Sequence, residues 1–269
     1  MVLSYRNEDV VLEAVESLLA QSVDLELVVS HSGGGRTEQL LAARPRTSVL
    51  ATSERRLPGA ARNAGVAATR APIVAFLAAD CVAAPGWAQA RLRRHRRGAA
   101  AVASALVPYG GGTCERAAWL AEHSARLPGV TCPSGGLHGV SYAREALERH
   151  GPFPEEMLCG EDTWLNRRLA DAGVAIEWAP EVVTLHRYRR RPGAVLVDAW
   201  SRGARRMVIR SHPVSRPYAV WSALRATPRA ARRGLAAGDC ISRRELAQAL
   251  PLVAACSVSK AAGAALARA

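Results

Sequence analysis

Along the first part of the chain, short apolar runs alternate with segments of helical periodicity. The run Met1–Tyr5 predicts a buried strand, and Asn7 is placed to cap the helix that follows. The apolar side chains of this helix fall on one face: Val11, Val15, Leu18 and Leu19. A second apolar run, Leu25–Val29, leads into the glycines Gly33–Gly35 and a short helical segment from Thr37. The strand and helix pattern is therefore repeated.

The same alternation continues to residue 77. Ser48–Ala51 predicts a third strand, Pro58–Thr69 a helix opened by proline, and Ile73–Leu77 a fourth strand. Strands that alternate with helices at this spacing indicate an α/β fold with a mainly parallel sheet and right-handed crossovers. Ligands of such sheets bind beyond the carboxyl ends of the strands. The segments to inspect for function are therefore Tyr5–Asn7, Ser30–Gly35 and Ala78–Cys81.

The second half of the chain contains fewer periodic segments. Three elements are predicted there: a helix at Glu161–Ala172 and short strands at Ala175–Trp178 and Val182–Leu185. From about Pro192 onward the sequence has a helical pattern and is rich in arginine. We therefore expect an α/β domain over residues 1–191 and a helical C-terminal extension over residues 192–269.

Within this extension, Leu246–Ala265 is apolar but composed mostly of small residues, and Pro251 and Lys260 interrupt it. A spanning helix needs about 20 strongly apolar residues. We therefore expect the segment to pack on the protein core or to lie on a membrane surface.

The charge balance is strongly basic. The net charge is +13, and Lys260 is the only lysine, a skew that points first to codon bias. A basic surface attracts nucleic acid, anionic lipid head groups or the diphosphate of a nucleotide sugar, and charge alone does not choose among them. The sequence has no ribonucleoprotein motif, no zinc-finger spacing and no basic region leading into heptads, so we expect no nucleic-acid partner.

The cysteines and the first residues bear on the cellular compartment. The six cysteines form no CxxC pair, which favours reduced thiols over a zinc site or a disulfide framework. The N-terminal residues lack the charged and apolar regions of a signal peptide. We expect a cytoplasmic location, with peripheral contact with the inner membrane surface as an option.

The block from Leu57 to Trp87, LPGAARNAGVAATRAPIVAFLAADCVAAPGW, resembles family 2 glycosyltransferases. In that family an ARN.G helix leads into a strand that ends in an acidic DxD-like motif, here FLAADC. The resemblance implies the GT-A fold and an inverting transfer from a nucleotide-diphosphate sugar. Asp80 would then hold Mn²⁺ or Mg²⁺ under the donor diphosphate, with Ala79 beside the donor. Ala78 stands where the family has its first acid, and Asp80 alone is also consistent with a helix cap or loop acid.

The block from Gly160 to His186, GEDTWLNRRLADAGVAIEWAPEVVTLH, is similar to the family's ED motif and its distal histidine. The resemblance implies that Asp162 is the base for the acceptor hydroxyl, that Glu161 supports it, and that His186 is a metal ligand. A helix N-terminus favours the ionised carboxylate. Alternatively, both acids merely complement the first helical turn, and His186 is a hydrogen-bonded structural residue.

Two further segments resemble the donor site of the family. SYRNE is similar to the first-strand motif, which implies that Ser4, Tyr5 and Arg6 cradle the nucleotide. The second strand leads into SHSGGGRT, with Ser30 where the family usually has acids, so the nucleotide base is left open. The glycines there are either a flexible turn or a site of close backbone approach to the donor.

Four residues form a second tier of candidates. Arg62 and Asn63 lie in the matched helix and are candidate contacts to the nucleotide or diphosphate, although an exposed arginine on such a helix is equally ordinary. Trp164 and His138 are candidates for the border of the acceptor pocket, since aromatic faces stack on sugar rings. The alternative for Trp164 is a packing role in the fold.

Together these resemblances imply an inverting glycosyltransferase that acts on a glycan or lipid-linked acceptor in cell-surface polysaccharide or glycolipid synthesis. Its cofactor would be Mn²⁺ or Mg²⁺ and its donor a nucleotide-diphosphate sugar. Ala78 and Ser30 motivate an alternative: a catalytically silent relative that binds sugar nucleotide or scaffolds a glycan assembly complex.

Overall fold

The structure is a computed structural model that describes residues 1–130, 139–208 and 214–267. The chain forms two compact units. The first consists of Met1–Ala105 with Ser134–Leu185, and the second consists of Leu106–Pro133 with His186–Ala269.

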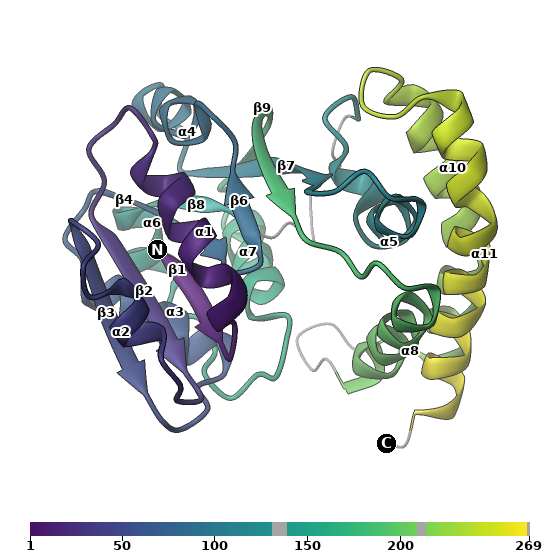
Figure 1. Ribbon diagram of the computed structural model, residues 1–269, viewed down its shortest axis with the longest axis horizontal. Coiled ribbons are helices and arrows are strands. Elements are labelled where there is room, and N and C mark those ends of the chain that lie inside the picture. Colours follow the sequence, from purple (N-terminus) through teal and green to yellow (C-terminus); the bar gives the residue numbers. More distant parts are fainter. Residues whose placement is uncertain (131–138, 209–213, 268–269) are drawn as a thin grey trace. The chain divides into compact units, whose positions relative to one another are not determined.

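The first unit contains a four-stranded parallel sheet in the order β3-β2-β1-β5. Its strands are β1 (Val2–Tyr5), β2 (Leu27–Ser32), β3 (Thr47–Thr52) and β5 (Leu77–Ala78). Strands β1, β2 and β3 of this sheet are labelled in Figure 1. The helices that connect them are α1 (Glu8–Leu19), α2 (Thr37–Leu41) and α3 (Pro58–Ala67). Asn7 precedes α1 as predicted, but its side chain makes no capping hydrogen bond, and its backbone oxygen accepts from Val11 instead.

A five-stranded sheet follows in the order β4-β8-β7-β9-β6. Its strands are β4 (Ile73–Ala75), β8 (Ser141–Ala143), β7 (Ala101–Pro108), β9 (Ile176–His186) and β6 (Cys81–Ala83). The helices near them in sequence are α4 (Trp87–Arg96), α6 (Arg144–His150) and α7 (Glu161–Asp171). β8 pairs antiparallel with β4 and β7, and this antiparallel part was not predicted.

Two predicted strand boundaries were wrong. The run predicted as one strand at 73–77 is divided between the two sheets, because buried Phe76 packs edge-on against Tyr142 and Phe153 and separates β4 from β5. The two strands predicted at 175–178 and 182–185 are one strand, β9. Pro180 lies within β9, three residues before Val183, whose backbone oxygen accepts from Ala84 just after the end of β6.

The core of the first unit explains why α3 is built from small residues. Val2, Val29 and Leu77 of the parallel sheet are buried in this core, and α3 packs against β2 and β1. A Cβ atom at Gly65 would lie 2.0 Å from the Cε of Met1. A larger residue at this position would therefore require the Met1 side chain to move.

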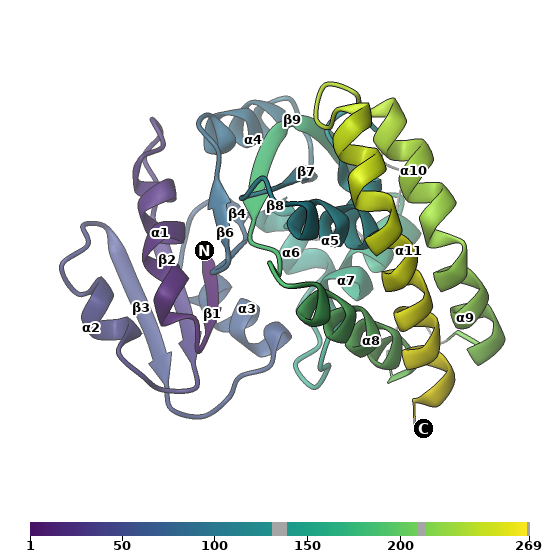
Figure 2. The ribbon, with the colours of Figure 1, turned by 45° about the vertical axis from the view of Figure 1, so that its right-hand side comes forward.

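The second unit is helical, as predicted for the C-terminal segment. Its helices are α5 (Thr113–His123), α8 (Pro192–Val208), α9 (Arg216–Leu224), α10 (Ala226–Ala236) and α11 (Arg243–Leu266), with a 3₁₀ turn at Ser124–Arg126. α11 packs against α5, α8, α9 and α10 (Figure 2). The core between them includes Trp119, Leu120, Val195, Val253 and Cys256. The helix α5 was not predicted from the sequence.

Helix α11 is long and apolar enough to cross a membrane by length and composition. The same helix contributes Leu246, Val253 and Cys256 to the core of the second unit. Length and composition therefore do not separate a spanning helix from a core helix here.

Candidate active site

The candidate site begins at the carboxyl edge of the parallel sheet. β1 and β5 are parallel neighbours, with Leu3 paired to Ala78, and the backbone N–H of Ala79 donates to Leu3 O at 2.9 Å. Ser4 and Tyr5 therefore emerge at the same edge as Ala79 and Asp80, as a ligand site of a parallel sheet requires.

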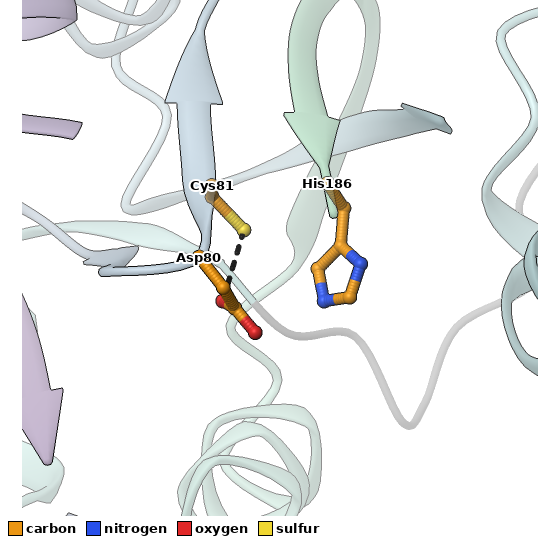
Figure 3. A group of neighbouring side chains, drawn as sticks. All are labelled: Asp80, Cys81 and His186. Carbon is orange, nitrogen blue, oxygen red and sulfur yellow. Dashed lines mark hydrogen bonds between the residues drawn. The ribbon is translucent and has the colours of Figure 1, made fainter. Parts of the chain in front are cut away.

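Asp80 lies in the turn between β5 and β6 and is half-buried. The Cys81 thiol donates a hydrogen bond to Asp80 Oδ1 at 3.7 Å. His186 is the last residue of β9, the strand beside β6 in the five-stranded sheet. Asp80, Cys81 and His186 each offer one ligand atom, and these atoms lie within 4.8 Å of one another (Figure 3).

This donor set fits a divalent cation. A carboxylate oxygen and an imidazole nitrogen are ligands for Mn²⁺, and oxygens of a diphosphate would fill further positions. Asp80 and His186 were predicted as ligands, whereas Cys81 was not. The cysteine directly follows Asp80 in the sequence, but only the spatial arrangement shows its thiol beside the two predicted ligands.

Two aromatic side chains that the sequence pattern did not indicate contact His186. The ring of Tyr188 lies 4.4 Å from the His186 ring and that of His123 lies 5.6 Å from it, centroid to centroid. The Tyr188 hydroxyl and His123 Nδ1 form a hydrogen bond of 2.9 Å. The imidazole of His186 is thus held in an aromatic cluster.

The end of β2 is fixed by His31. Its Nδ1 lies 3.1 Å from Ser4 Oγ, and its Nε2 lies 2.7 Å from the backbone oxygen of Gly34. His31 and Ser4 are both buried. The histidine therefore ties the glycine loop to the first strand. Ser30 is also buried within β2, and its Oγ has no hydrogen-bond partner among the described residues.

Tyr5 is the exposed aromatic group at this edge. The guanidinium groups of Arg6 and Arg55 lie 5.5 Å and 5.0 Å from the centre of its ring. Gly33, which has a positive φ of 93°, brings the backbone so close that a Cβ atom would lie 2.9 Å from Tyr5 Cε2. The glycine loop thus permits the position of the tyrosine ring.

Arg62 joins α3 to the start of α7. Its Nε donates to Glu161 Oε1 at 3.0 Å, and one terminal nitrogen lies 3.9 Å from Asp162 Oδ2. Its guanidinium also lies 4.9 Å from the ring centre of Phe76 and 5.4 Å from that of Phe153. Phe76 separates β4 from β5, the strand that leads to the candidate metal ligand, so Arg62 links both predicted motifs.

Arg62 and Glu161 shift each other's pKa values, and Asp162 shifts both. Burial opposes the charge of Arg62, but Glu161 and Asp162 outweigh it, and the pKa of Arg62 is raised. Burial and then Asp162 raise the pKa of Glu161, against the opposing effect of Arg62. Arg62 thus offsets the negative charge of two neighbouring carboxyl groups at the buried start of α7.

Asn63, predicted to contact the nucleotide-sugar donor, instead hydrogen-bonds the loop that contains Phe153 and Glu155. Its amide nitrogen donates to Phe153 O and to Glu155 Oε1, both at 2.8 Å, and its oxygen accepts from Phe153 N at 3.0 Å.

Asp162 and Trp164 occupy the first turn of α7. The N-cap is Gly160, with a positive φ of 86°, and Asp162 Oδ1 accepts from Thr163 N at 2.7 Å. Trp164 is half-buried, and Arg168 lies 5.4 Å above its ring. His138 lies outside the described residues.

The sequence pattern that defines Glycosyl transferase family 2 matches residues 1–169. The chain belongs to this family. It is 31% identical over 183 residues to the succinoglycan biosynthesis protein ExoO of Rhizobium meliloti (strain 1021), a match that covers 60% of this chain and 52% of that protein. It is 28% identical over 178 residues to the pre-mycofactocin glycosyltransferase of Mycobacterium tuberculosis, covering 61% of this chain and 38% of the relative. The chain thus spans about half or less of these curated relatives.

The fold of this family 2 chain also resembles solved structures. The mannosyltransferase PcManGT from Pyrobaculum calidifontis, in complex with GDP-Man and Mn²⁺, has a TM-score of 0.62 at 18% identity, covering 98% of this chain and 86% of that one. The predicted family and GT-A fold are therefore confirmed.

Proposed function

We propose that this family 2 chain transfers a sugar from a nucleotide-diphosphate sugar to an acceptor hydroxyl with inversion at the anomeric carbon. The observation that best supports this proposal is the buried pairing of Arg62 with Glu161 and Asp162. Through Phe76, this pairing connects the acidic start of α7 to the strand segment that ends at Asp80. The two acids that the chemistry needs thus lie on connected elements.

The donor would bind at the carboxyl edge of β1. The exposed ring of Tyr5 offers a stacking surface for the nucleobase, and Arg6 and Arg55 beside it supply positive charge for phosphate oxygens. Ser4 positions His31 and the glycine loop, and the backbone N–H of buried Ala79, bonded to Leu3, fixes the start of the turn that carries Asp80. In this proposal Ser30 and Asn63 support the site without contacting the donor. Ser30 is buried, and Asn63 is hydrogen-bonded to the loop at Phe153.

Asp80 and His186 would hold Mn²⁺ or Mg²⁺. When bound, such an ion neutralises negative charge on the diphosphate leaving group. The neighbouring Cys81 thiol hydrogen-bonds the carboxylate and orients it. The Mn²⁺ complex of the mannosyltransferase with the same fold supports this assignment.

Asp162 would act as the base that accepts the proton of the attacking hydroxyl. Its place in the first turn of α7 favours the ionised form. Glu161 is a positioning residue, since its carboxylate is engaged by Arg62. Trp164, two residues further along, would border the acceptor.

The acceptor would be a glycan or a lipid-linked glycan. The relative named for succinoglycan biosynthesis supports a role in polysaccharide synthesis, and a cytoplasmic location suits the supply of nucleotide sugars.

The test has two stages. A panel of nucleotide sugars with Mn²⁺ is screened for a rise in melting temperature, since a ligand that binds the folded state stabilises it. With the donor found, release of nucleoside diphosphate is measured for Asp162→Asn and for the control Asp171→Asn at the other end of α7. We expect Asp162→Asn to lose roughly 10²- to 10⁴-fold in kcat while retaining donor binding. Full turnover in this variant would refute the base assignment.

One observation favours a second candidate, a sugar-nucleotide binder without turnover. Ala78 is exposed at the end of β5 and supplies no oxygen where the family has an acid. Donor-dependent stabilisation without nucleoside diphosphate release, for every acceptor offered, would select this candidate.

A further inference from the structure

Helices α9 and α10 direct their large apolar side chains outward. Tyr218, Trp221, Leu224 and Leu235 are each at least half exposed. The buried positions of the same helices hold only small residues: Ala219, Ala223, Ala230 and Gly234. An ordinary surface helix has the reverse arrangement, with its large apolar residues in the core.

The small inner residues have a packing reason. A Cβ atom at Gly234 would lie 2.7 Å from Leu246 Cδ1 of α11, so glycine lets α10 approach α11 without displacing the Leu246 side chain. The views show α9 and α10 alongside α11 (Figure 2). No such packing reason accounts for the large outer residues among the described parts of the chain.

The charged residues of α9, α10 and their junction are all of one sign. Residues 216–236 contain five arginines and no aspartate or glutamate. The exposed arginines of α9, α10 and their junction are Arg216, Arg225, Arg229 and Arg232. The guanidinium of Arg225 lies 4.7 Å from the ring centre of Trp221, and the ring of Tyr218 lies 5.9 Å from that ring. Aromatic, aliphatic and cationic groups thus form one outer face.

We propose that this α9–α10 face, made of Tyr218, Trp221, Leu224 and Leu235 with the four exposed arginines, binds an anionic membrane surface. Tryptophan and tyrosine favour the boundary between head groups and acyl chains, where leucine side chains enter the apolar layer. Arginine is attracted to anionic head groups. Single-stranded nucleic acid would use the aromatic rings but gains nothing from exposed leucines, which offer no stacking face. This proposal goes beyond the transfer reaction and does not rest on it.

The test is co-sedimentation of the full chain with vesicles of phosphatidylcholine, with and without phosphatidylglycerol. We expect binding only to the anionic vesicles. The double variant Arg225→Gln/Arg232→Gln should bind them roughly 30-fold more weakly, about fivefold for each charge removed. The matched control is Arg96→Gln/Arg97→Gln at the end of α4, which removes the same charge from the other unit.

A second measurement reports insertion. Lipids brominated in the upper acyl chain should quench tryptophan fluorescence in the wild type, and Trp221→Phe should remove that quenching while the variant still sediments with vesicles. Three results would overturn the proposal: no binding to anionic vesicles at low salt, equal weakening by the control pair, or displacement of the chain from vesicles by a single-stranded RNA oligonucleotide that binds more tightly.

Discussion

Replacing Arg62 tests whether this side chain organises the ED motif or binds the donor. In Arg62→Met the side-chain length is kept, but Glu161 and Asp162 lose their shared cation. The side chains of Arg62 and Glu161 are only 12% and 6% exposed. Removing one partner of a buried ion pair costs about 3–5 kcal/mol, because the remaining charge stays buried without compensation. We expect a loss of this size in the unfolding free energy of the first unit.

The pH dependence provides a sharper check. Without Arg62, the pKa of Glu161, already raised by burial and by Asp162, rises further above its unfolded value. The folded variant then retains a proton that the unfolded chain releases as pH increases. The destabilisation should therefore be smallest below the ordinary glutamate pKa of 4.5 and should grow as pH rises toward neutrality.

The assay is urea unfolding monitored through hydrogen exchange of the α3 and α7 amides, which reports the stability of the first unit separately. A double-mutant cycle with Glu161→Met isolates the pair, and the double variant should recover much of the loss. A cost under about 1 kcal/mol, or strict additivity in the cycle, would refute the structural role. A rise in KM for the donor without any stability change would instead restore Arg62 as a donor contact.

The remaining predictions concern stability and metal selectivity. Burial raises the pKa of Glu122 to about 8, so the folded chain holds a proton that the unfolded chain loses above pH 4.5. The unfolding free energy of the second unit should therefore fall as the pH rises from 4.5 to about 8. Glu122→Gln should flatten this pH profile in a denaturant series. Gly59→Ala should cost about 1–3 kcal/mol by thermal unfolding, because its Cβ would lie 1.9 Å from the backbone oxygen of Pro154, whereas Gly193→Ala, with open space around it, should not destabilise the chain. Zn²⁺ should inhibit Mn²⁺-supported turnover, since a thiol favours the softer ion, and Cys81→Ser should raise the inhibitory Zn²⁺ concentration; unchanged inhibition would exclude the thiol as a ligand.

The sequence predicted those features that depend on local pattern. Alternating apolar runs and helical segments were sufficient for the parallel sheet, and the two motif blocks were sufficient for the family. The antiparallel pairing of β8 with β4 and β7 was not predicted, because three-residue strands carry too little periodicity to be recognised.

Contacts between side chains that are distant in sequence could not be predicted either. Arg62 and Glu161 are 99 residues apart, and Asn63 and Phe153 are 90 apart. A residue pattern indicates that a side chain is buried but does not name the group it meets. For the same reason the ring contacts of His186 with His123 and Tyr188 emerged only from the folded chain.

The crossing at Phe76 bears on how the first unit gains and loses its structure. With β4 in one sheet and β5 in the other, the edge of each sheet is completed by residues on opposite sides of a single buried ring. Neither sheet can detach without exposing that ring and the arginine stacked on it. Partial opening of this region is therefore costly, and the segment that carries the candidate ligands should melt in one cooperative step.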